Sequence, residues 1–460
     1  MNSLDPALNL LDQRREEALA RLFDLLRIPS ISTDPAYAAH CQTAADWLVT
    51  DLTAMGFEAV AHPTGGHPIV LAEDLSAEGP HVLFYGHYDV QPVDPLELWD
   101  SAPFEPQMIE VAGAGPAIRA RGAGDDKGQL MTFLEACRAL KSANGALPCK
   151  VTILLEGEEE TGGKHLPGFL EQHAERLGKA DIALVCDTSM WDARTPAITT
   201  MLRGMVGEEV TIHGPDRDLH SGYYGGAAAN PLAVLSQILG ALHDGEGRVQ
   251  IDGFYDGVPE IPANIRAQWD ALPFEESAFL GEIGLSRPWG EQDRGVLEQT
   301  WARPTAEVNG VWGGYTGAGF KTVIPAEAHA KISFRLVGQQ DPAKIREGFR
   351  RFVRDRLPSD CRASFIAYGG SGATAMPVAD PVFEKARAAL TAEWGSEAAF
   401  IGSGGSIPVV GQMQQILGLD SMLIGFGLAD DAIHSPNEKY QLASFEKGAR
   451  SWARVLVALA

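Results

Sequence analysis

The sequence lacks the features that mark exported and membrane proteins. Its five cysteines are odd in number and show no C-x-x-C spacing, which excludes a disulfide framework and a cysteine-based zinc site. No apolar run approaches the roughly 18 residues of a membrane span. The first 23 residues carry Asp5 and an amphipathic rhythm, whereas a signal peptide has a basic end and an apolar core. We therefore expect a cytoplasmic protein.

Positive charge is also scarce. Lysine and arginine total 37 against 61 acidic residues, for a formal net charge of −24 at pH 7. A surface of this sign repels nucleic-acid phosphates and anionic lipid headgroups. Neither nucleic acid nor a membrane is expected as a partner, whereas cations are.

The patterns that are present predict an α/β catalytic domain. Helical spacing of leucines predicts a helix over 8–26, and further helices are expected over 128–142 and 166–177. Short runs that are apolar throughout indicate central strands of a mostly parallel sheet flanked by helices. These runs lie at 81–86, 150–155, 181–186 and 421–427.

The pattern of apolar and polar residues changes at roughly 203–370. Strand-like segments there alternate between apolar and polar residues, as in "GEEVTIHG" and "HAKISFRLVG", and a helix is expected over 341–356. We interpret 203–370 as an inserted α+β domain. The catalytic domain is then discontinuous, comprising 1–202 and 371–460.

The stretch "LLEGEEETGG" places four carboxylates in the five residues 156–160, directly after an apolar run. Taken alone, such a cluster is most simply a solvated turn, because like charges repel and their burial is costly. Other acids and histidines follow the remaining apolar runs, and the carboxyl ends of parallel strands share one edge of a sheet. These residues are His87, Asp89, Asp187 and His434, with Asp125 and Asp126 at the start of a predicted helix.

Convergence of so many acids requires positive charge. Two Zn²⁺ ions bring four positive charges, which three carboxylates and one hydroxide balance, while two neutral imidazoles complete the ligand set. Imidazole and carboxylate ligands without thiolate suit zinc, with Mn²⁺ or Co²⁺ as alternatives. The sequence thus predicts two divalent metal ions as cofactors.

Several motifs together resemble one family. They are "HYDVQP", "RGAGDDKG", "LLEGEEETGG", "CDTSMW", "DLHSGYYGG", "KTVIP", "FRLVG", "GGSIPVV" and "IHSPNE", in this order over nearly the whole chain. They look like those of the di-metal exopeptidase family that contains cytosolic (carnosine-type) dipeptidases, aminoacylase, acetylornithine deacetylase and succinyl-diaminopimelate desuccinylase. "DLHSG", "KTVIP" and "GGSIP" are most similar to the dipeptidase branch.

The resemblance implies two ligand sets that share Asp125. His87, Asp125 and Asp187 would hold one metal ion, and Asp125, Glu160 and His434 the other. It also implies a cis peptide bond between Asp125 and Asp126.

Further roles are implied by the same resemblance. Glu159 would be the general acid and base that takes a proton from the attacking water and gives it to the leaving amine. Asp89 would orient His87 through its second ring nitrogen. His220 resembles a histidine of a lid domain that reaches the active site of the other subunit in a homodimer. For His220 alone, a hydrogen bond within a turn is the plainer alternative.

The substrate contacts are implied in the same way. Arg335, Thr322 and Ser406 resemble residues that bind the carboxylate and backbone of the substrate, although a salt bridge on a strand is the plainer role for Arg335. Dipeptidase relatives often carry Arg-Glu where this chain has Gly402 and Ser403, which leaves side-chain specificity open.

The implied function is metal-dependent hydrolysis of a dipeptide or similar small peptide that bears a free carboxylate. In this family an aspartate at the position of Asp187 accompanies peptidases that act at a free amino terminus. The alternative is an amidohydrolase acting on N-acyl amino acids.

Overall fold

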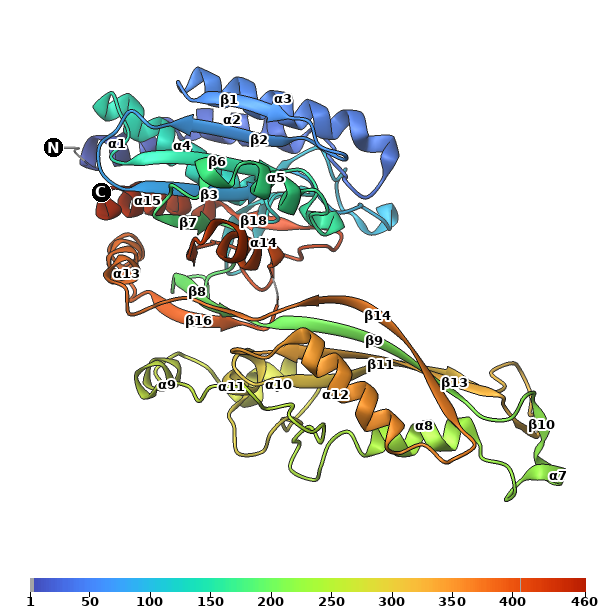
Figure 1. The fold of residues 1–460 in the computed structure, drawn as a ribbon. Coiled ribbons are helices and arrows are strands. Elements are labelled where there is room, and N and C mark those ends of the chain that lie inside the picture. Colours follow the sequence, from blue (N-terminus) through green and yellow to red (C-terminus); the bar gives the residue numbers. More distant parts are fainter. Residues whose placement is uncertain (1–3, 406) are drawn as a thin grey trace. The chain divides into compact units, whose positions relative to one another are not determined.

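The computed structural model describes residues 4–405 and 407–460 (Figure 1). They form two compact units. The first unit contains residues up to Thr200, then Met376–Ile401 and Pro408–Ala460. The second unit contains Met201–Ala375 and the short segment that begins at Gly402. The second unit therefore includes the predicted insertion of 203–370, and also 201–202, 371–375 and a segment from Gly402, which were predicted to belong to the catalytic domain.

The largest sheet has nine strands, in the order β1-β2-β6-β3-β7-β17-β8-β15, with β16 paired to β8. The pairs β6·β3, β3·β7 and β7·β17 are parallel, and the outer pairs are antiparallel. The strands are β1 (Glu58–His62), β2 (Ile69–Asp74), β3 (His81–His87), β6 (Lys150–Glu156), β7 (Ile182–Val185), β8 (Ala197–Leu202), β15 (Thr374–Ala375), β16 (Ala399–Ser403) and β17 (Ser421–Leu423). The predicted apolar runs are thus β3, β6, β7 and β17, and the predicted α/β class is confirmed.

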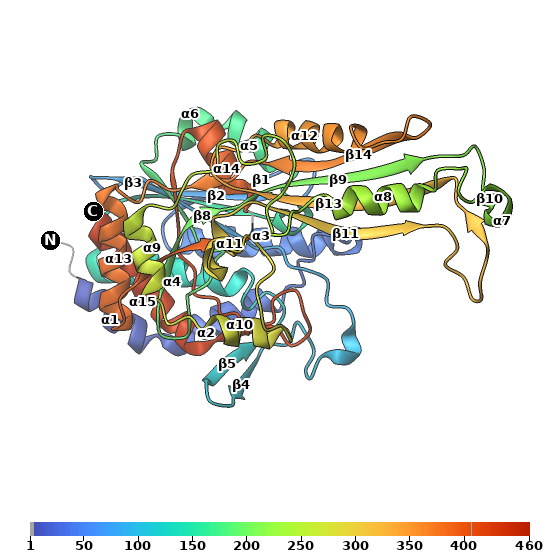
Figure 2. The same cartoon turned by 90° about the horizontal axis from the view of Figure 1, so that it is seen from below.

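Helices cover both faces of this sheet (Figures 1 and 2). Helices α1 to α4 and α15 lie on one face, and α5, α6 and α14 lie on the other. Their bounds are α1 (Leu4–Gln13), α2 (Arg15–Leu26), α3 (Ala38–Ala54), α4 (Lys127–Asn144), α5 (Leu166–Gln172), α6 (Ala174–Leu177), α13 (Pro381–Trp394), α14 (Pro408–Gln412) and α15 (Leu442–Leu459). A small sheet, β18-β5-β4, joins β4 (Gln107–Val111), β5 (Gly115–Arg119) and β18 (Lys439–Gln441).

Two predicted helices were each wrong in being continuous. The helix expected over 8–26 is α1 and α2, because Arg14 leaves helical geometry with φ −104° and ψ 22°. The helix expected over 166–177 breaks at His173, with φ −106° and ψ 10°. An apolar stripe runs through both segments, so periodicity alone does not show such breaks.

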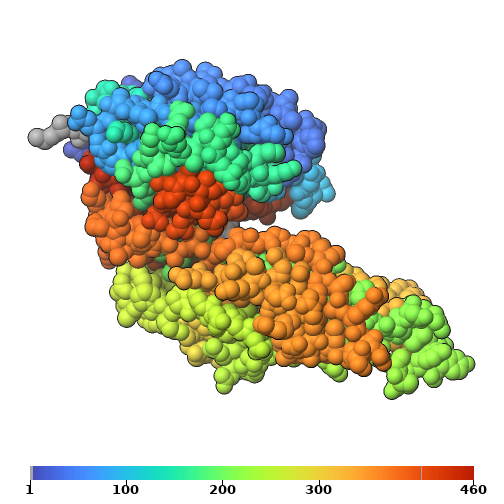
Figure 3. Space-filling view, in the orientation of Figure 1, coloured from blue at the N-terminus to red at the C-terminus, as the bar shows by residue number. Residues whose placement is uncertain are grey.

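Aromatic packing joins the sheet to the helices of the first unit. The ring of Phe84 on β3 stacks on Phe133 of α4 with centroids 3.8 Å apart. Trp452 of α15 meets both rings edge-on and is fully buried. Segments from the two ends of the chain therefore share one core. On the surface of this unit, Figure 3 shows a red patch at the place of α14, beside the green segments.

The second unit is built on a four-stranded antiparallel sheet, in the order β11-β13-β9-β14. Along β9 every second residue is buried, and Val206, Val210 and Ile212 of this set form a core with apolar side chains of α8 and α12. The predicted helix over 341–356 is α12. The bounds are β9 (Gly204–His213), β10 (Leu219–His220), β11 (Thr305–Gly313), β12 (Val323–Ile324), β13 (Glu327–Leu336), β14 (Arg362–Ser371), α7 (Ser221–Tyr224), α8 (Pro231–Gly240), α9 (Ala263–Asp270), α10 (Glu276–Glu282), α11 (Val296–Trp301) and α12 (Pro342–Arg354).

Among the described residues, no helix has the length and apolar character needed to cross a membrane.

Candidate metal centre

The ends of three neighbouring strands bring the predicted ligands together. His87 is the last residue of β3, Asp187 follows β7, and the 3-10 turn Glu159–Thr161 follows β6. Asp125 lies just before α4, and its peptide bond to Asp126 is cis. Because β6, β3 and β7 are parallel, their carboxyl ends lie at the same edge of the sheet.

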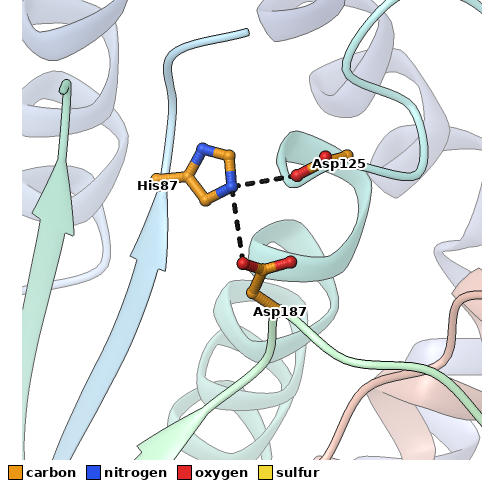
Figure 4. A group of neighbouring side chains, drawn as sticks. All are labelled: His87, Asp125 and Asp187. Carbon is orange, nitrogen blue, oxygen red and sulfur yellow. Dashed lines mark hydrogen bonds and ion pairs between the residues drawn. The ribbon is translucent and has the colours of Figure 1, made fainter. Parts of the chain in front are cut away.

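Two groups of three ligand atoms form at this edge, each with all atoms within 4.8 Å of one another. In the first group, His87 Nε2 lies 3.0 Å from Asp125 Oδ1 and 3.9 Å from Asp187 Oδ2 (Figure 4). In the second, His434 Nε2 lies 2.9 Å from Asp125 Oδ2 and 3.3 Å from Glu160 Oε2. The two oxygens of Asp125 thus face different histidines, the arrangement of a bridging carboxylate.

The two groups differ in their access to solvent. The His87 side chain is fully buried, whereas the His434 side chain is 54% exposed. The first group therefore lies deep at the strand ends, and the second opens to solvent.

Burial and neighbouring charges shift the pKa values of these side chains. Burial raises the pKa of Asp187 well above its usual range, and the nearby Asp125 adds to the effect. Burial also acts to raise the pKa of Asp125, but hydrogen bonds to His434 and His87 outweigh it and lower that pKa. Hydrogen bonds to Asp125 and Glu160 raise the pKa of His434 to about 10. The carboxylates of the site thus favour the protonated, positively charged form of the imidazoles.

The donor set suits divalent metal ions. Glu160 Oε1 is buried and has no hydrogen-bond partner among the described residues. A buried carboxylate oxygen without a donor is costly, and a coordinated cation removes that cost. Carboxylate oxygens and imidazole nitrogens without thiolate match the ligand preferences of zinc, manganese and cobalt.

Asp89 connects the end of β3 to the turn that follows β6. Its fully buried carboxylate accepts hydrogen bonds from Ser32 Oγ at 2.6 Å and from the backbone nitrogens of Glu159 and Glu160 at 3.3 and 3.0 Å. His87 Nδ1 lies 3.1 Å from the Asp89 backbone oxygen and 3.4 Å from Asp89 Oδ1. Asp89 therefore lies where it can orient His87, and it also holds the turn that carries the two glutamates.

The acidic stretch is not a solvated turn. Glu156 is 2% exposed and accepts a hydrogen bond from Tyr85 Oη at 2.6 Å, and Glu158 is 9% exposed with its carboxylate 2.7 Å from His165 Nδ1. Both acids are paired inside the protein, Glu156 with a residue far away in sequence and Glu158 with a residue seven positions ahead. Burial raises the pKa of Glu159, whose carboxylate lies close to those of Glu160 and Asp89.

The predicted substrate contacts lie in the second unit. His220 ends β10 and is exposed, and its Nδ1 accepts a hydrogen bond from Gly222 N at 3.0 Å. Thr322 is exposed just before β12. Ser406 lies outside the described residues. Arg335 on β13 lines a cavity of about 430 Å³ together with Arg203.

Arg203 was missed by the sequence analysis. Burial, reinforced by the charge of Arg335, lowers the pKa of Arg203 to about 10. Its Nε donates to Gly404 O at 3.1 Å, and Glu307, which lines the same cavity, acts on Arg203 through its charge. Two guanidinium groups in one cavity favour an anion there, with only part of their charge balanced by Glu307. The single arginine in "MLRG" does not indicate this cavity in the sequence, because its approach to Arg335 depends on how the strands pair.

The position of Gly402 has a structural reason. A Cβ atom there would lie 2.6 Å from Trp301 Cβ and 3.0 Å from Met201 Cγ. A side chain at this position would therefore collide with Trp301 unless Trp301 moved.

The comparisons with known proteins agree with this geometry. Residues 83–458 match the family described as Peptidase family M20/M25/M40. The chain is 28% identical to the Cys-Gly metallodipeptidase DUG1 of Saccharomyces cerevisiae, over 99% of this chain and 98% of that protein. It is also 28% identical to human Beta-Ala-His dipeptidase, over 85% of this chain and 78% of that protein.

Solved structures show the same fold. An M20 family metallo-carboxypeptidase, Sso-CP2 from Sulfolobus solfataricus, superposes with a TM-score of 0.81 at 31% identity, covering 96% of this chain and 99% of that one. The dipeptidase Dug1p from Saccharomyces cerevisiae superposes with a TM-score of 0.79 at 27% identity, covering 100% and 99%.

Proposed function

The chain belongs to peptidase family M20/M25/M40, as its motifs predicted, and on that premise we propose that it is a di-metal dipeptidase. It cleaves the amide bond of dipeptides or similar small peptides with a free carboxylate. The observation that carries this proposal is the pair of three-ligand groups that share Asp125.

His87, Asp125 and Asp187 hold one divalent ion in this proposal, and Asp125, Glu160 and His434 hold the other. Zinc is the proposed metal, with Mn²⁺ or Co²⁺ as alternatives. When bound, the ions polarise the scissile carbonyl and lower the pKa of water. Asp89 keeps His87 oriented through the contacts to its Nδ1.

Glu159 is the proposed general base and acid. Its carboxylate takes a proton from the attacking water and then delivers it to the leaving amine. The raised pKa of Glu159, caused first by burial, makes its carboxylate a stronger base toward the proton of the attacking water. The backbone hydrogen bond from Glu159 N to Asp89 fixes the turn from which its side chain projects.

The second unit is proposed to act as a lid and dimerisation domain that contacts the substrate. Arg335 binds the substrate carboxylate, and Thr322 and Ser406 bind its backbone. The cavity that Arg335 shares with Arg203 supports an anionic group at this end of the substrate. His220 stabilises the oxyanion in the site of the second subunit of a homodimer. A cytoplasmic location completes the proposal.

Two rival activities have specific support. N-acyl amino acid amidohydrolases belong to the family that the motifs resemble, and the 31% identical relative is a metallo-carboxypeptidase. Both rivals accept a blocked amine, whereas a dipeptidase requires a free one. Relatives that are a Cys-Gly metallodipeptidase and a Beta-Ala-His dipeptidase favour the dipeptidase.

The test compares substrates and one glutamate variant. Purified protein is assayed with free dipeptides and with their N-acetyl and N-succinyl forms, and hydrolysis of free dipeptides is expected. The variant Glu159→Gln should keep its metal, measured by elemental analysis, and lose about 10²- to 10⁴-fold in kcat because it cannot accept the proton.

Glu158→Gln is the matched control. Glu158 immediately precedes Glu159 and pairs with His165, so this change should leave kcat within a few-fold of wild type. Hydrolysis of blocked substrates alone would defeat the dipeptidase proposal, and unchanged turnover in Glu159→Gln would defeat the role of Glu159.

A further inference from the structure

The Glu438 carboxylate is fully buried beside the metal centre but belongs to neither ligand group. Its Oε2 accepts hydrogen bonds from Arg121 Nη1 at 2.7 Å and from Gly122 N at 3.0 Å. Its Oε1 accepts from Gly124 N at 2.8 Å and from Asp125 N at 3.1 Å. One side chain therefore binds three backbone nitrogens of the loop that ends at the shared ligand Asp125.

These four donors use the hydrogen-bonding capacity of the carboxylate. An ionised carboxylate offers about four lone-pair sites, and each oxygen here already accepts two bonds. Glu438 is thus occupied by the loop and is not a further metal ligand. Arg121, which is 1% exposed, supplies the compensating charge.

The charge partner is itself fixed in place. Arg121 Nη2 donates to Pro92 O at 2.9 Å, and its guanidinium lies 5.4 Å from the ring centroid of Trp99. Pro92 follows the segment of His87 and Asp89. The same hydrogen-bond network therefore extends from the Asp125 loop to the residues that follow β3.

Glu438 also lies at one end of the loop that carries His434. The other end of that loop is held at Asp431, whose carboxylate accepts from Lys439 Nζ at 2.7 Å and from Leu428 N at 2.7 Å. The loop is thus anchored on both sides of His434. Through Glu438 its anchor is bonded directly to the Asp125 loop.

We propose that Glu438 is a positioning residue that sets Asp125 against His434 before any metal ion arrives. The two ligands lie on loops more than 300 residues apart in sequence, and Asp125 Oδ2 lies 2.9 Å from His434 Nε2. Because Asp125 is shared, a shift of its loop weakens both ligand groups. This inference rests on the proposed metal centre and adds the residue that pre-forms it.

The test measures metal affinity in Glu438→Gln. The amide nitrogen of glutamine cannot accept, so one pair of buried N–H groups loses its acceptor and the loop relaxes. Competition with a chromophoric chelator for Zn²⁺ should show affinity reduced by about 10- to 100-fold, the range for residues that support metal ligands.

Glu393→Gln is the matched control. Its carboxylate is also buried, and it accepts from Arg450 Nε at 2.6 Å and Arg454 Nε at 2.7 Å, between α13 and α15. This variant should bind Zn²⁺ as wild type does. If Glu438→Gln melts at a lower temperature but binds Zn²⁺ with wild-type affinity, Glu438 only supports the fold and the proposal is wrong.

A measurement on the wild-type chain covers the case in which Glu438→Gln does not fold. In protein stripped of metal, hydrogen exchange at the amides of Gly122, Gly124 and Asp125 should be slow. Rapid exchange that slows only when Zn²⁺ is added would mean that the metal organises this loop, which overturns the proposal. Failure of the wild type to bind two ions per chain would instead contradict the proposed metal centre.

Discussion

At the scale of single residues, the candidate metal centre contains more carboxylates than positively charged groups. His87 is fully buried, which acts to lower its pKa, yet hydrogen bonds to Asp125 and Asp89 raise that pKa well above its usual value. The pKa of His434 is raised to about 10 from an ordinary 6.5. The stabilisation from His434 is therefore fully present below pH 6.5 and is lost as the pH rises through about 10.

Metal uptake should release protons, because both imidazoles must be neutral to bind a metal ion. At pH 8, titration of the stripped protein with Zn²⁺ is expected to release at least about one proton per chain from these histidines. Calorimetry in buffers of different ionisation enthalpy measures this number, which should fall as the pH approaches 10.

His243→Gln is the control for this count. His243 lies in the second unit, and burial lowers its pKa, so it is neutral at pH 8. The variant should release as many protons as wild type. A binding enthalpy that is the same in all buffers would contradict the raised pKa values.

At the scale of elements, the packing of the turn before α4 leaves no space for a side chain at Gly128. A Cβ atom on Gly128 would lie 1.9 Å from Ala123 O and 2.9 Å from Tyr440 Cδ1. This close approach lets the turn pass from β5 to α4 while Asp125 stays at the strand ends. Gly122, with φ +83°, provides the left-handed conformation that the same turn requires.

The variant Gly128→Ala should therefore destabilise the protein by about 1–3 kcal/mol or more, because the added methyl group overpacks the turn. Gly168→Ala on α5 is the control, since nothing lies within 4 Å of its Cβ position and alanine favours a helix. Denaturant unfolding followed by circular dichroism measures both. Equal stability of the two variants would show that the turn can yield.

At the scale of the whole molecule, the proposed chemistry is divided between the two units. The proposed metal ligands and Glu159 belong to the first unit, and His220, Thr322 and Arg335 belong to the second. His220 is exposed, and the hydrogen bond of its side chain, from Gly222 N, lies within its own turn. An exposed histidine of this kind is available to a second copy of the chain, as the proposed homodimer requires.

Mixing two inactive variants tests this sharing. If His220 serves the other subunit, a heterodimer of His220→Ala and Glu159→Gln contains one complete site. Random pairing of equal amounts makes half of the dimers mixed, so about one quarter of wild-type activity should return. The recovery is measured after subunit exchange, and each variant incubated alone is the control. Absence of recovery would contradict a shared site.

The sequence by itself determined the class of the fold and the residues that converge on its sheet edge. Four apolar runs become β3, β6, β7 and β17, because burial of a whole strand needs only local apolar composition. His87, Glu160, Asp187 and His434 were expected at one sheet edge because each follows an apolar run, and Asp125 was expected there at the start of a helix. The family resemblance then singled out these five residues. Their roles as ligands remain a prediction from the family resemblance.

Only the tertiary structure decided which acids are buried and what holds them. Glu156 and Glu158 leave water because Tyr85 and His165 are near them in space, and Glu438 is ionically paired and bonded to a loop more than 300 residues away. Hydrophobic periodicity is a local property of the chain, whereas the partners of a buried charge come from distant segments, so their identity follows from the fold.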